Sequence, residues 1–534
     1  MNRRFFLQKT GIATVASLLP YSSKANHHTS SVSRNNSGIK PFLFFDLWKL
    51  DYWDNISLKQ AEPELIEESI YEDNTIDRKG PGKPCVFYDS NTKVWRMIYN
   101  IGWSPVGLMS AISEDGIHWQ QDPHPEIKFH PIWGKRIADH HIFNLDDAAA
   151  GGMYIDPLAK DGFPYKIYIQ RKGQPVFQKA LQDKRHHLHK LAKYGVSERV
   201  FHEGRTIVSE DGLNWHLHPD YNWSRPGFQP EPPYFGFYNS NTGKHHMTLR
   251  PGWGDRRVAM QTTEDFEQWS EPSLLLQMDP LDTAATGFYA MPVISVGHMY
   301  VGLMWTFHNS SSRLVDSFNL YYGKMDNQLT YSYDGIHFVR GLRKSFLELN
   351  LFPMHGSTQL RTYSIIEYED KVRMYSGAVR APHGLERTVQ VEGLAPKAIV
   401  MHQIRKDSWM YLQSKGHWAK ILTKPMAIFS DEIYLNAQAP FGEVRFQLTD
   451  EKSTPIEGFT YENCIPLKMD DQMRYQLRWD GNGLAQIKGK IVRLEMEFNN
   501  ANIFAIYMDY HMLDAEDMWL LKEGQSIERR WFDY

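Results

Sequence analysis

The sequence predicts an all-β protein, a five-bladed β-propeller followed by a C-terminal β-sandwich. Three observations predict it: a short motif that recurs between residues 113 and 409, pairs of strand-like runs before its copies, and a change of pattern near residue 420. Aromatic residues make up 13% of the 534 residues. This richness is common in β-proteins and in clefts that stack on flat ligands such as sugar rings.

The recurring motif is a Ser or Thr, an Asp-Gly pair two residues later, and then an aromatic residue at a fixed offset. Asp-Gly favours a tight turn, because Gly tolerates positive φ and Asp hydrogen-bonds its own turn. Five copies predict five blades, since a propeller avoids exposed sheet edges by radial repetition. The third copy has Phe in place of Gly and the fifth is degraded. The copies are 113–119, 209–215, 263–269, 332–338 and 405–409.

Apolar or alternating runs precede the copies and predict the strands of each blade. Turn-forming segments such as 89–92 and 239–243 separate paired runs. Residues 179–199 are rich in Lys, His, Leu and Arg, and they predict a helical insertion in the second unit. The predicted strand runs are 85–88, 94–99, 165–170, 234–238, 246–249, 299–305, 363–368 and 371–375.

After residue 424 the pattern becomes an even alternation of apolar and polar residues, which predicts a sandwich of jelly-roll type. The alternation is clearest at 432–436, 443–448, 475–479 and 492–498. The predicted organisation is an export signal at 1–25, a flexible linker at 26–40, the propeller at 41–420 and the sandwich at 421–534.

The N-terminus carries Arg3 and Arg4 before a short apolar run over 12–19 and small residues near 23–25, which resembles a twin-arginine export signal. The run is too short to span a bilayer, and the alternative is a frayed amphipathic segment. We therefore expect a soluble mature protein, periplasmic or secreted, without a membrane anchor.

Composition excludes several classes of partner and cofactor. The formal charge of −4 is too balanced for a protein that must neutralise many nucleic-acid phosphates. Two cysteines, Cys85 and Cys464, cannot form a disulfide framework or a four-thiolate zinc site, and their separation argues against a mutual bond. We expect no cofactor and no catalytic metal, while a structural cation in the propeller channel stays open.

The repeated turns followed by a sandwich resemble the five-bladed propeller glycosidases related to glycosyl hydrolase families 32 and 43, which include invertases, levanases and arabinanases. The resemblance is strongest to a secreted bacterial branch of that superfamily. It rests on the opening 43–46 and on the stretches 433–437 and 456–459. It covers essentially the whole mature chain and implies a hydrolase acting on a polysaccharide or oligosaccharide.

In the family, three carboxylates of the first three blades point into an axial pocket, because glycosidic cleavage needs a proton donor and a carboxylate or water on the opposite face. By this resemblance Asp156 is the stabiliser before Pro157, and Glu231, between prolines, is the general acid. The first blade lacks the usual carboxylate near 80–84, so Asp46 or Asp77 is the candidate nucleophile or base. Each Asp has a simpler interpretation as a turn or capping residue.

Asp146 and Asp147 compete with Asp156 for the second-blade position, and Asp147 is assigned to substrate binding. Some related enzymes are thought to use His as the proton donor. His355 is the favoured catalytic histidine, and His141 is a binding candidate. The other histidines considered are His140, His245 and His246.

Residues 250–257 combine three guanidinium groups with an indole. Arginine binds carboxylate or sulfate with two parallel hydrogen bonds, and Trp stacks on a sugar face. Arg250, Trp253 and Arg256 therefore predict binding of an acidic or sulfated glycan, against the simpler reading of a surface loop with one packed Trp.

The sequence thus predicts a secreted glycoside hydrolase acting on a plant or algal glycan. Two alternatives stay open: a glycan-binding propeller without activity, because the first-blade carboxylate is missing, and a polysaccharide lyase with His or Tyr as the base.

Overall fold

A computed structural model describes residues 38–72, 81–90, 92–101, 106–122, 141–145, 149–172, 202–224, 230–251, 256–283, 286–309, 323–349, 358–383 and 397–529. The predicted export signal and the predicted helical insertion at 179–199 lie outside these residues. Nearly all regular structure in the described part is β-strand. The exceptions are the short helix α3 (Ala515–Lys522) and the 3₁₀ turn η3 (Leu484–Gln486). The predicted all-β class is confirmed.

Three antiparallel sheets follow one another along the first half of the chain. The first comprises β5 (Pro81–Asp89), β6 (Val94–Ile101), β7 (Val106–Ser113), β8 (Gln120–Gln121) and β9 (His141–Leu145). The second comprises β10 (Ala149–Ile155), β11 (Tyr165–Lys172), β12 (His202–Ser209) and β13 (His216–Asn222). The third comprises β14 (Glu231–Asn239), β15 (Lys244–Arg250), β16 (Val258–Thr263) and β17 (Ser273–Leu276).

A nine-stranded sheet follows, and a single parallel bridge between Met325 and Gln359 divides it into two antiparallel halves. The first half contains β18 (Thr286–Ala290), β19 (Val293–Val296), β20 (Met299–Asn309), β21 (Gly323–Ser332) and β22 (Val339–Leu347). The second contains β23 (Gln359–Tyr368), β24 (Lys371–Val379), β25 (Lys397–Arg405) and β4 (Glu64–Tyr71). β4 precedes all the other strands of this sheet in sequence and pairs with the last of them, β25. This pairing joins the beginning of the region to its end.

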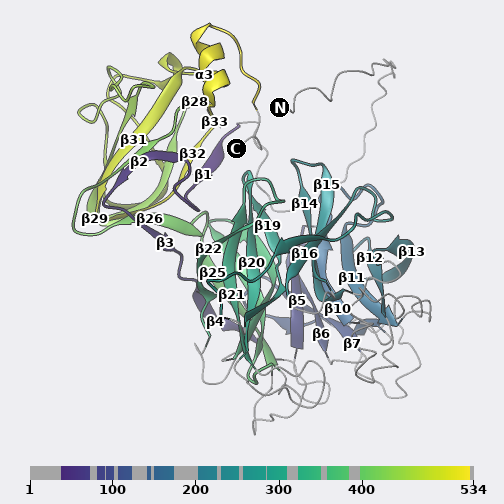
Figure 1. The fold of residues 1–534 in the computed structure, drawn as a ribbon. Helices are drawn as coiled ribbons and strands as arrows, with labels where there is room; N and C mark the ends of the chain where they lie inside the picture. Colours follow the sequence, from purple (N-terminus) through teal and green to yellow (C-terminus); the bar gives the residue numbers. More distant parts are fainter. Residues whose placement is uncertain are drawn as a thin grey trace, which may run out of the picture.

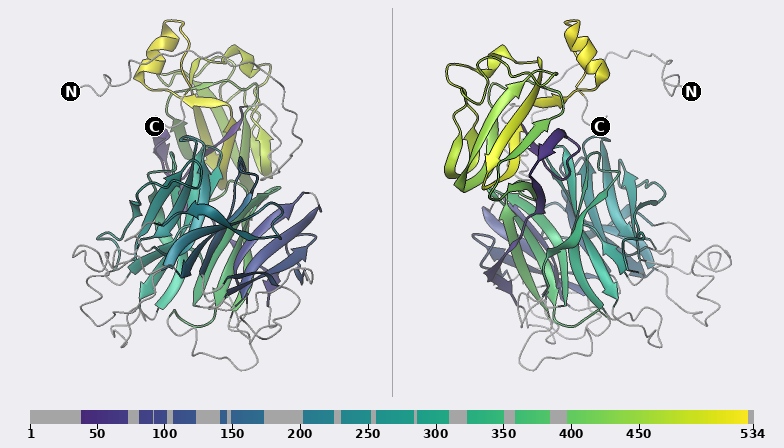
Figure 2. Two further views of the ribbon diagram at one scale, coloured as in Figure 1. Left: turned by 90° about the vertical axis from the view of Figure 1, so that its right-hand side faces the viewer. Right: turned by 60° about the vertical axis from the view of Figure 1, so that its left-hand side comes forward.

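The first strands of these units, β5, β10, β14, β18 with β19, and β23, contact one another in a closed ring. Glycines permit the closest approaches. A Cβ on Gly151 would lie 2.8 Å from the Tyr234 carbonyl oxygen, and one on Gly236 would lie 2.6 Å from the Tyr154 ring. Residue numbers rise together along both strands, so β10 and β14 run in the same direction. Figure 2 shows the sheets standing side by side around this centre.

The repeated turns fold as the sequence predicts. At the first copy the Ser113 hydroxyl accepts a hydrogen bond from the Gly116 N–H (2.9 Å), and Asp115 Oδ1 accepts two from the following N–H groups. Gly116 has φ +74°, a conformation that costs Gly little. The same bonds recur at the second, third and fourth copies, where the third holds Phe266 at φ +65°.

Each turn packs on the unit that precedes it around the ring. The Gly116 carbonyl accepts a bond from the Tyr375 hydroxyl (2.8 Å), and Gly212 faces Phe87. In the degraded fifth copy Trp409 stacks on Phe346 of β22, with ring centroids 5.7 Å apart. The aromatic at the fixed offset takes part in the same contact between neighbouring units, since the Trp119 ring packs edge-on against Tyr375 with centroids 6.1 Å apart. The third and fourth copies repeat it through Phe266 against Tyr154 and Gly335 against Asn239.

The C-terminal strands form an eleven-stranded sheet system of their own, seen as the yellow-green lobe in Figure 1. Three N-terminal strands belong to it: β1 (Lys40–Leu43), β2 (Leu50–Asp54) and β3 (Ser57–Gln60) pair with β32, β27 and β26. The other members are β26 (Met410–Ser414), β27 (Ala419–Thr423), β28 (Met426–Ile428), β29 (Tyr434–Thr449), β30 (Leu467–Gln476), β31 (Ile491–Asn499), β32 (Ala501–Met508) and β33 (Tyr510–Met512).

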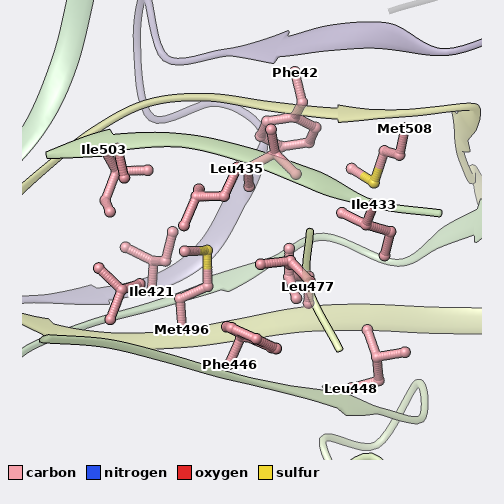
Figure 3. Close-up of a cluster of buried hydrophobic side chains, with 14 of the residues drawn as sticks. Phe42, Ile421, Ile433, Leu435, Phe446, Leu448, Leu477, Met496, Ile503 and Met508 are labelled. Carbon is pink, nitrogen blue, oxygen red and sulfur yellow. The ribbon is translucent and has the colours of Figure 1, made fainter. Parts of the chain in front are cut away.

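Alternating apolar residues of these strands meet in one core, shown in Figure 3. Leu435, Phe446 and Met496 are completely buried in it, and so is Phe42 from the N-terminal strand β1. Residues 40–60 thus lie with the C-terminal strands, although the sequence assigned residues from 41 onward to the propeller. The division at residue 420 and the jelly-roll connection stay predictions.

Candidate active site

Asp156 lies in a buried ion-pair cluster. Its Oδ2 is 3.0 Å from the ammonium of Lys166, and its Oδ1 accepts a bond from the Leu158 N–H (2.9 Å). Lys166 is fully buried, also contacts Asp161 (3.0 Å), and lies 4.4 Å from the Phe266 ring centroid. The carboxylate therefore balances a buried cation.

Asp156 and Glu231 lie at opposite ends of the strand ring. Asp156 follows the last residue of β10, whereas Glu231 is the first residue of β14, which runs beside β10 in the same direction. The seven residues of β10 span roughly 20 Å at about 3.3 Å per residue. The predicted convergence of Asp156 with Glu231 on one axial pocket is therefore wrong. Asp156 lies where β10 ends, whereas Glu231 lies where the neighbouring strand β14 begins.

His245 belongs to the cluster around Asp156. Its Nδ1 lies 2.7 Å from the Tyr154 hydroxyl and 3.9 Å from Asp156. Burial lowers the pKa of His245. His246 is buried as well, and burial lowers its pKa to about 4. Both histidines are on β15 near the Asp156 end, away from Glu231.

Asp46 joins the C-terminal lobe to the fourth unit. Its carboxylate accepts bonds from the hydroxyls of Tyr331 (2.9 Å) and Tyr333 (2.9 Å) and from the Trp48 N–H (2.9 Å). Burial and the Asp46 charge raise the pKa of both tyrosines. These contacts are those of a structural residue, so they argue against the predicted role of nucleophile or base.

Glu231 pairs through its backbone with Arg250, the last residue of β15. Arg250 is 6% exposed, and its guanidinium carbon lies 4.1 Å from the ring centroid of Tyr289 in β18. Arg256 approaches the same ring (5.2 Å) and that of Phe307 (5.2 Å). The structure therefore brings together two of the predicted binding arginines at the end of the ring where β14 begins.

Tyr289 is the residue that connects this group. Its hydroxyl lies 2.6 Å from Nε2 of His383, which follows β24. Tyr289 and His383 are both partly exposed. A phenol bonded to an imidazole and flanked by two guanidinium groups can hold or move a proton beside an anionic ligand. No sequence motif marks either residue, and neither lies in or next to a strand that the sequence predicts.

A second polar pair lies next to Phe307. His308 Nε2 is 3.1 Å from Asp326 Oδ2, and the hydrogen bond with Asp326 raises the pKa of His308. The His308 side chain is 43% exposed, while that of Asp326 is 11% exposed. The sequence analysis missed this pair, which joins the neighbouring strands β20 and β21.

Aromatic packing lies beneath these groups. Phe235, Trp305 and Tyr363 are buried and contact one another at 4.9–5.7 Å between ring centroids. They come from β14, β20 and β23, and Tyr289 packs against the same cluster. The packing fixes the positions of the strand ends that carry Arg250 and Tyr289.

Several predicted residues lie outside the description. Asp77, Asp147, Trp253 and His355 belong to segments that the structure does not describe, as do Asp146 and His140. For Glu231 and His141 the structure describes the backbone, in which His141 of β9 pairs with Met109 of β7. Their predicted roles stay predictions.

In the described part of the chain no three His, Cys, Asp or Glu side chains are grouped as metal ligands. Both cysteines are free thiols. Among the same residues, no helix is long and apolar enough to cross a membrane.

No protein-family model and no curated protein matches the sequence. Solved structures match it weakly. An N-acetylgalactosamine deacetylase from F. plautii, in complex with blood group B trisaccharide, has 14% identity and a TM-score of 0.40, covering 65% of this chain and 95% of that one. A β-1,2-mannobiose phosphorylase from Listeria innocua has 11% identity and a TM-score of 0.40 (65% and 97%). An exo-inulinase from Aspergillus awamori has 9% identity and a TM-score of 0.37 (80% and 95%). At these scores the matches do not establish a shared fold or activity.

Proposed function

We propose that the chain is an exported glycosidase, built on a five-bladed β-propeller with a C-terminal β-sandwich, that cleaves an acidic or sulfated plant or algal glycan. The four-stranded units, the closed ring of their first strands and the β4 closure support the propeller. The observation that carries the function is the Tyr289 group: two guanidiniums on one phenol ring and an imidazole on its hydroxyl, at the end of the ring where Glu231 begins β14.

In this proposal Glu231 donates a proton to the leaving oxygen as the glycosidic bond breaks. Water attacks the anomeric carbon from the other face and passes its proton to a carboxylate, for which Asp147 is the candidate. Arg250 and Arg256 hold the charged group of the substrate, and aromatic rings such as Tyr289 offer an apolar face to a sugar.

The test is release of reducing sugar from a panel of neutral, uronate-containing and sulfated plant and marine glycans. We expect Glu231→Gln to lower turnover by about 10²–10⁴-fold, the usual contribution of a positioned proton donor. Glu264→Gln is the matched control, because Glu264 is an exposed carboxylate of the same unit, paired with Lys244 (3.0 Å), in its repeated turn. A folded protein that releases sugar from none of the glycans, or a fully active Glu231→Gln variant, would contradict the proposal.

The Tyr289 and His383 pair favours a second candidate, a polysaccharide lyase. Here the Tyr289 hydroxyl passes its proton to His383, and the phenolate oxygen removes the C5 proton of a uronate. The C4–O bond breaks, a C4=C5 double bond forms, and the leaving oxygen takes the proton held on His383. The two arginines would neutralise the uronate carboxylate. An unsaturated product that absorbs in the ultraviolet distinguishes this reaction from hydrolysis, and binding without any product would indicate a glycan-binding protein.

A further inference from the structure

Gln170 is a buried glutamine of the second unit that reaches into the third. It is the sixth residue of β11 and is 7% exposed. Its side-chain Nε2 donates a hydrogen bond to the carbonyl of Pro230 (2.9 Å), the residue directly before Glu231. The bond therefore crosses from one unit to the next at the point where β14 begins. The sequence analysis did not single out Gln170.

The chain around Glu231 is stiff because of its prolines. The Pro230 carbonyl belongs to the planar peptide unit that ends at the Glu231 Cα, so a contact that holds this oxygen also orients the start of the glutamate. The rings of Pro230 and Pro232 each fix φ at about −65°, and Pro232 restricts the residue before it to extended backbone. Few local rotations can therefore compensate for the loss of a contact with the Pro230 carbonyl.

A second buried donor reaches the same oxygen. The Tyr234 hydroxyl donates to the Pro230 carbonyl (3.3 Å). Tyr234 is completely buried, and its ring packs on that of Trp223 with centroids 4.5 Å apart. The Trp223 indole N–H donates to the Arg205 carbonyl (2.9 Å), which fixes the indole in turn. Two donors, one from each unit, thus restrict the oxygen and use both of its lone pairs.

Gln170 also lies beside the start of β10. Its backbone pairs with Ala149, the first residue of β10, which follows Asp147 by two positions. A glycine brings β10 against β14 at this level, since a Cβ on Gly151 would lie 2.9 Å from the Tyr234 nitrogen. Gln170 therefore connects the start of the strand that follows the candidate base with the start of the strand that opens with the candidate acid.

We propose that Gln170 is a positioning residue, whose amide holds Glu231 where it can pass a proton to the leaving oxygen. The proposal rests on the glycosidase function proposed above and adds a residue on which the position of the acid depends. Gln170 acts through the backbone before Glu231 and needs no contact with the substrate. A displacement of about 1 Å can cost roughly 10²-fold in rate, so the loss of one hydrogen bond here should be measurable.

Gln170→Met removes the donor and keeps a side chain of similar volume. On a glycan that the wild-type protein cleaves, we expect kcat to fall by about 10–100-fold with little change in KM, because the substrate still binds while the acid is displaced. A dinitrophenyl glycoside of the released sugar should lose far less, because its leaving group departs without a proton. Glu231→Gln should show the same difference between the two substrates.

Gln261→Met is the matched control. Gln261 is a completely buried glutamine of the third unit, and its Nε2 donates to the Ser270 carbonyl (3.0 Å), directly after the repeated turn. This variant should lower the urea midpoint of unfolding about as much as Gln170→Met and leave kcat unchanged on both substrates. Equal losses of kcat in the two variants, or full kcat in a folded Gln170→Met variant, would overturn the positioning role.

Crystal structures of the same two variants distinguish this proposal from the proposed function, since they need no turnover. We expect the Glu231 Cα to move relative to β10 by more than about 0.5 Å, the tolerance of a catalytic site, in Gln170→Met and to keep its place in Gln261→Met. A wild-type protein that cleaves no glycan would refute the glycosidase, and a displaced Glu231 would then still support its positioning by Gln170. An unmoved Glu231 would overturn the positioning whether or not a glycan is cleaved.

Discussion

The ammonium of Lys166 lies 3.0 Å from the carboxylate of Asp156, and both side chains are almost completely buried. This ion pair connects β11 to the turn after β10. It gives a structural reason for the carboxylate before Pro157, which by its sequence resembles a catalytic residue. Removing a charge from water is costly unless a partner of opposite charge replaces the lost hydration.

We expect Lys166→Met to lower the free energy of unfolding by about 3–5 kcal/mol, because it leaves buried carboxylate charge without its cation. Urea unfolding followed by fluorescence measures the change. Lys244→Met removes an exposed pair and should cost under about 1 kcal/mol. If both variants unfold at the same urea concentration, the buried pair does not contribute as argued.

Gly116→Ala should destabilise the protein by about 1–3 kcal/mol, since a Cβ there would lie 2.6 Å from the Arg373 guanidinium and 2.9 Å from Trp95, on top of the positive φ. Gly162→Ala is the control, with φ +83° and open space around its Cβ position. It should cost about 1 kcal/mol, the conformational part alone. If thermal unfolding shows that Gly116→Ala and Gly162→Ala lose the same amount of stability, the contact of Gly116 with the neighbouring unit does not contribute.

Tyr289→Phe should lower turnover of a cleaved glycan at least tenfold with little change in KM, because the ring against Arg250 remains while the hydroxyl bonded to His383 is lost. Tyr331→Phe loses a hydroxyl bonded to Asp46 and should keep full turnover. Steady-state kinetics of both variants provide the measurement. A Tyr289→Phe enzyme with unchanged turnover would remove this hydroxyl from the reaction.

Asp407 makes stability depend on pH. Burial, followed by the charge of Glu367, raises its pKa from 3.8 to about 6 in the folded protein. The folded state therefore holds more protons than the unfolded state between about pH 4 and 6, and the contribution of Asp407 to stability falls as pH rises through this window.

We expect Asp407→Asn to remove this contribution while still accepting the bond from Tyr507 and tolerating φ +60°. Urea unfolding at pH 4.5, 5.5 and 6.5 should show a smaller decline for the variant than for the wild-type protein. Parallel curves for the two proteins would contradict the raised pKa.

Sequence reasoning succeeded where the information is local. The Ser113 and Asp115 bonds close within a few residues, so the repeated turns and their spacing could be recognised directly. It also singled out Arg250 and Arg256, since guanidiniums cluster in a short stretch, and their role in binding stays a prediction. It could not find Tyr289 with His383, because 94 residues separate them and neither has a distinctive neighbourhood.

The sequence by itself therefore determined the all-β class, the tight turns and the alternating C-terminal strands, because backbone preference and side-chain alternation act over a few residues. Only the tertiary structure decided that β1 to β3 pair with the C-terminal strands and that Asp156 and Glu231 lie at opposite strand ends. Such pairings depend on which distant surfaces bury each other best and in which direction each strand runs. A local motif around one carboxylate determines neither which distant surfaces pack together nor the direction in which each strand runs.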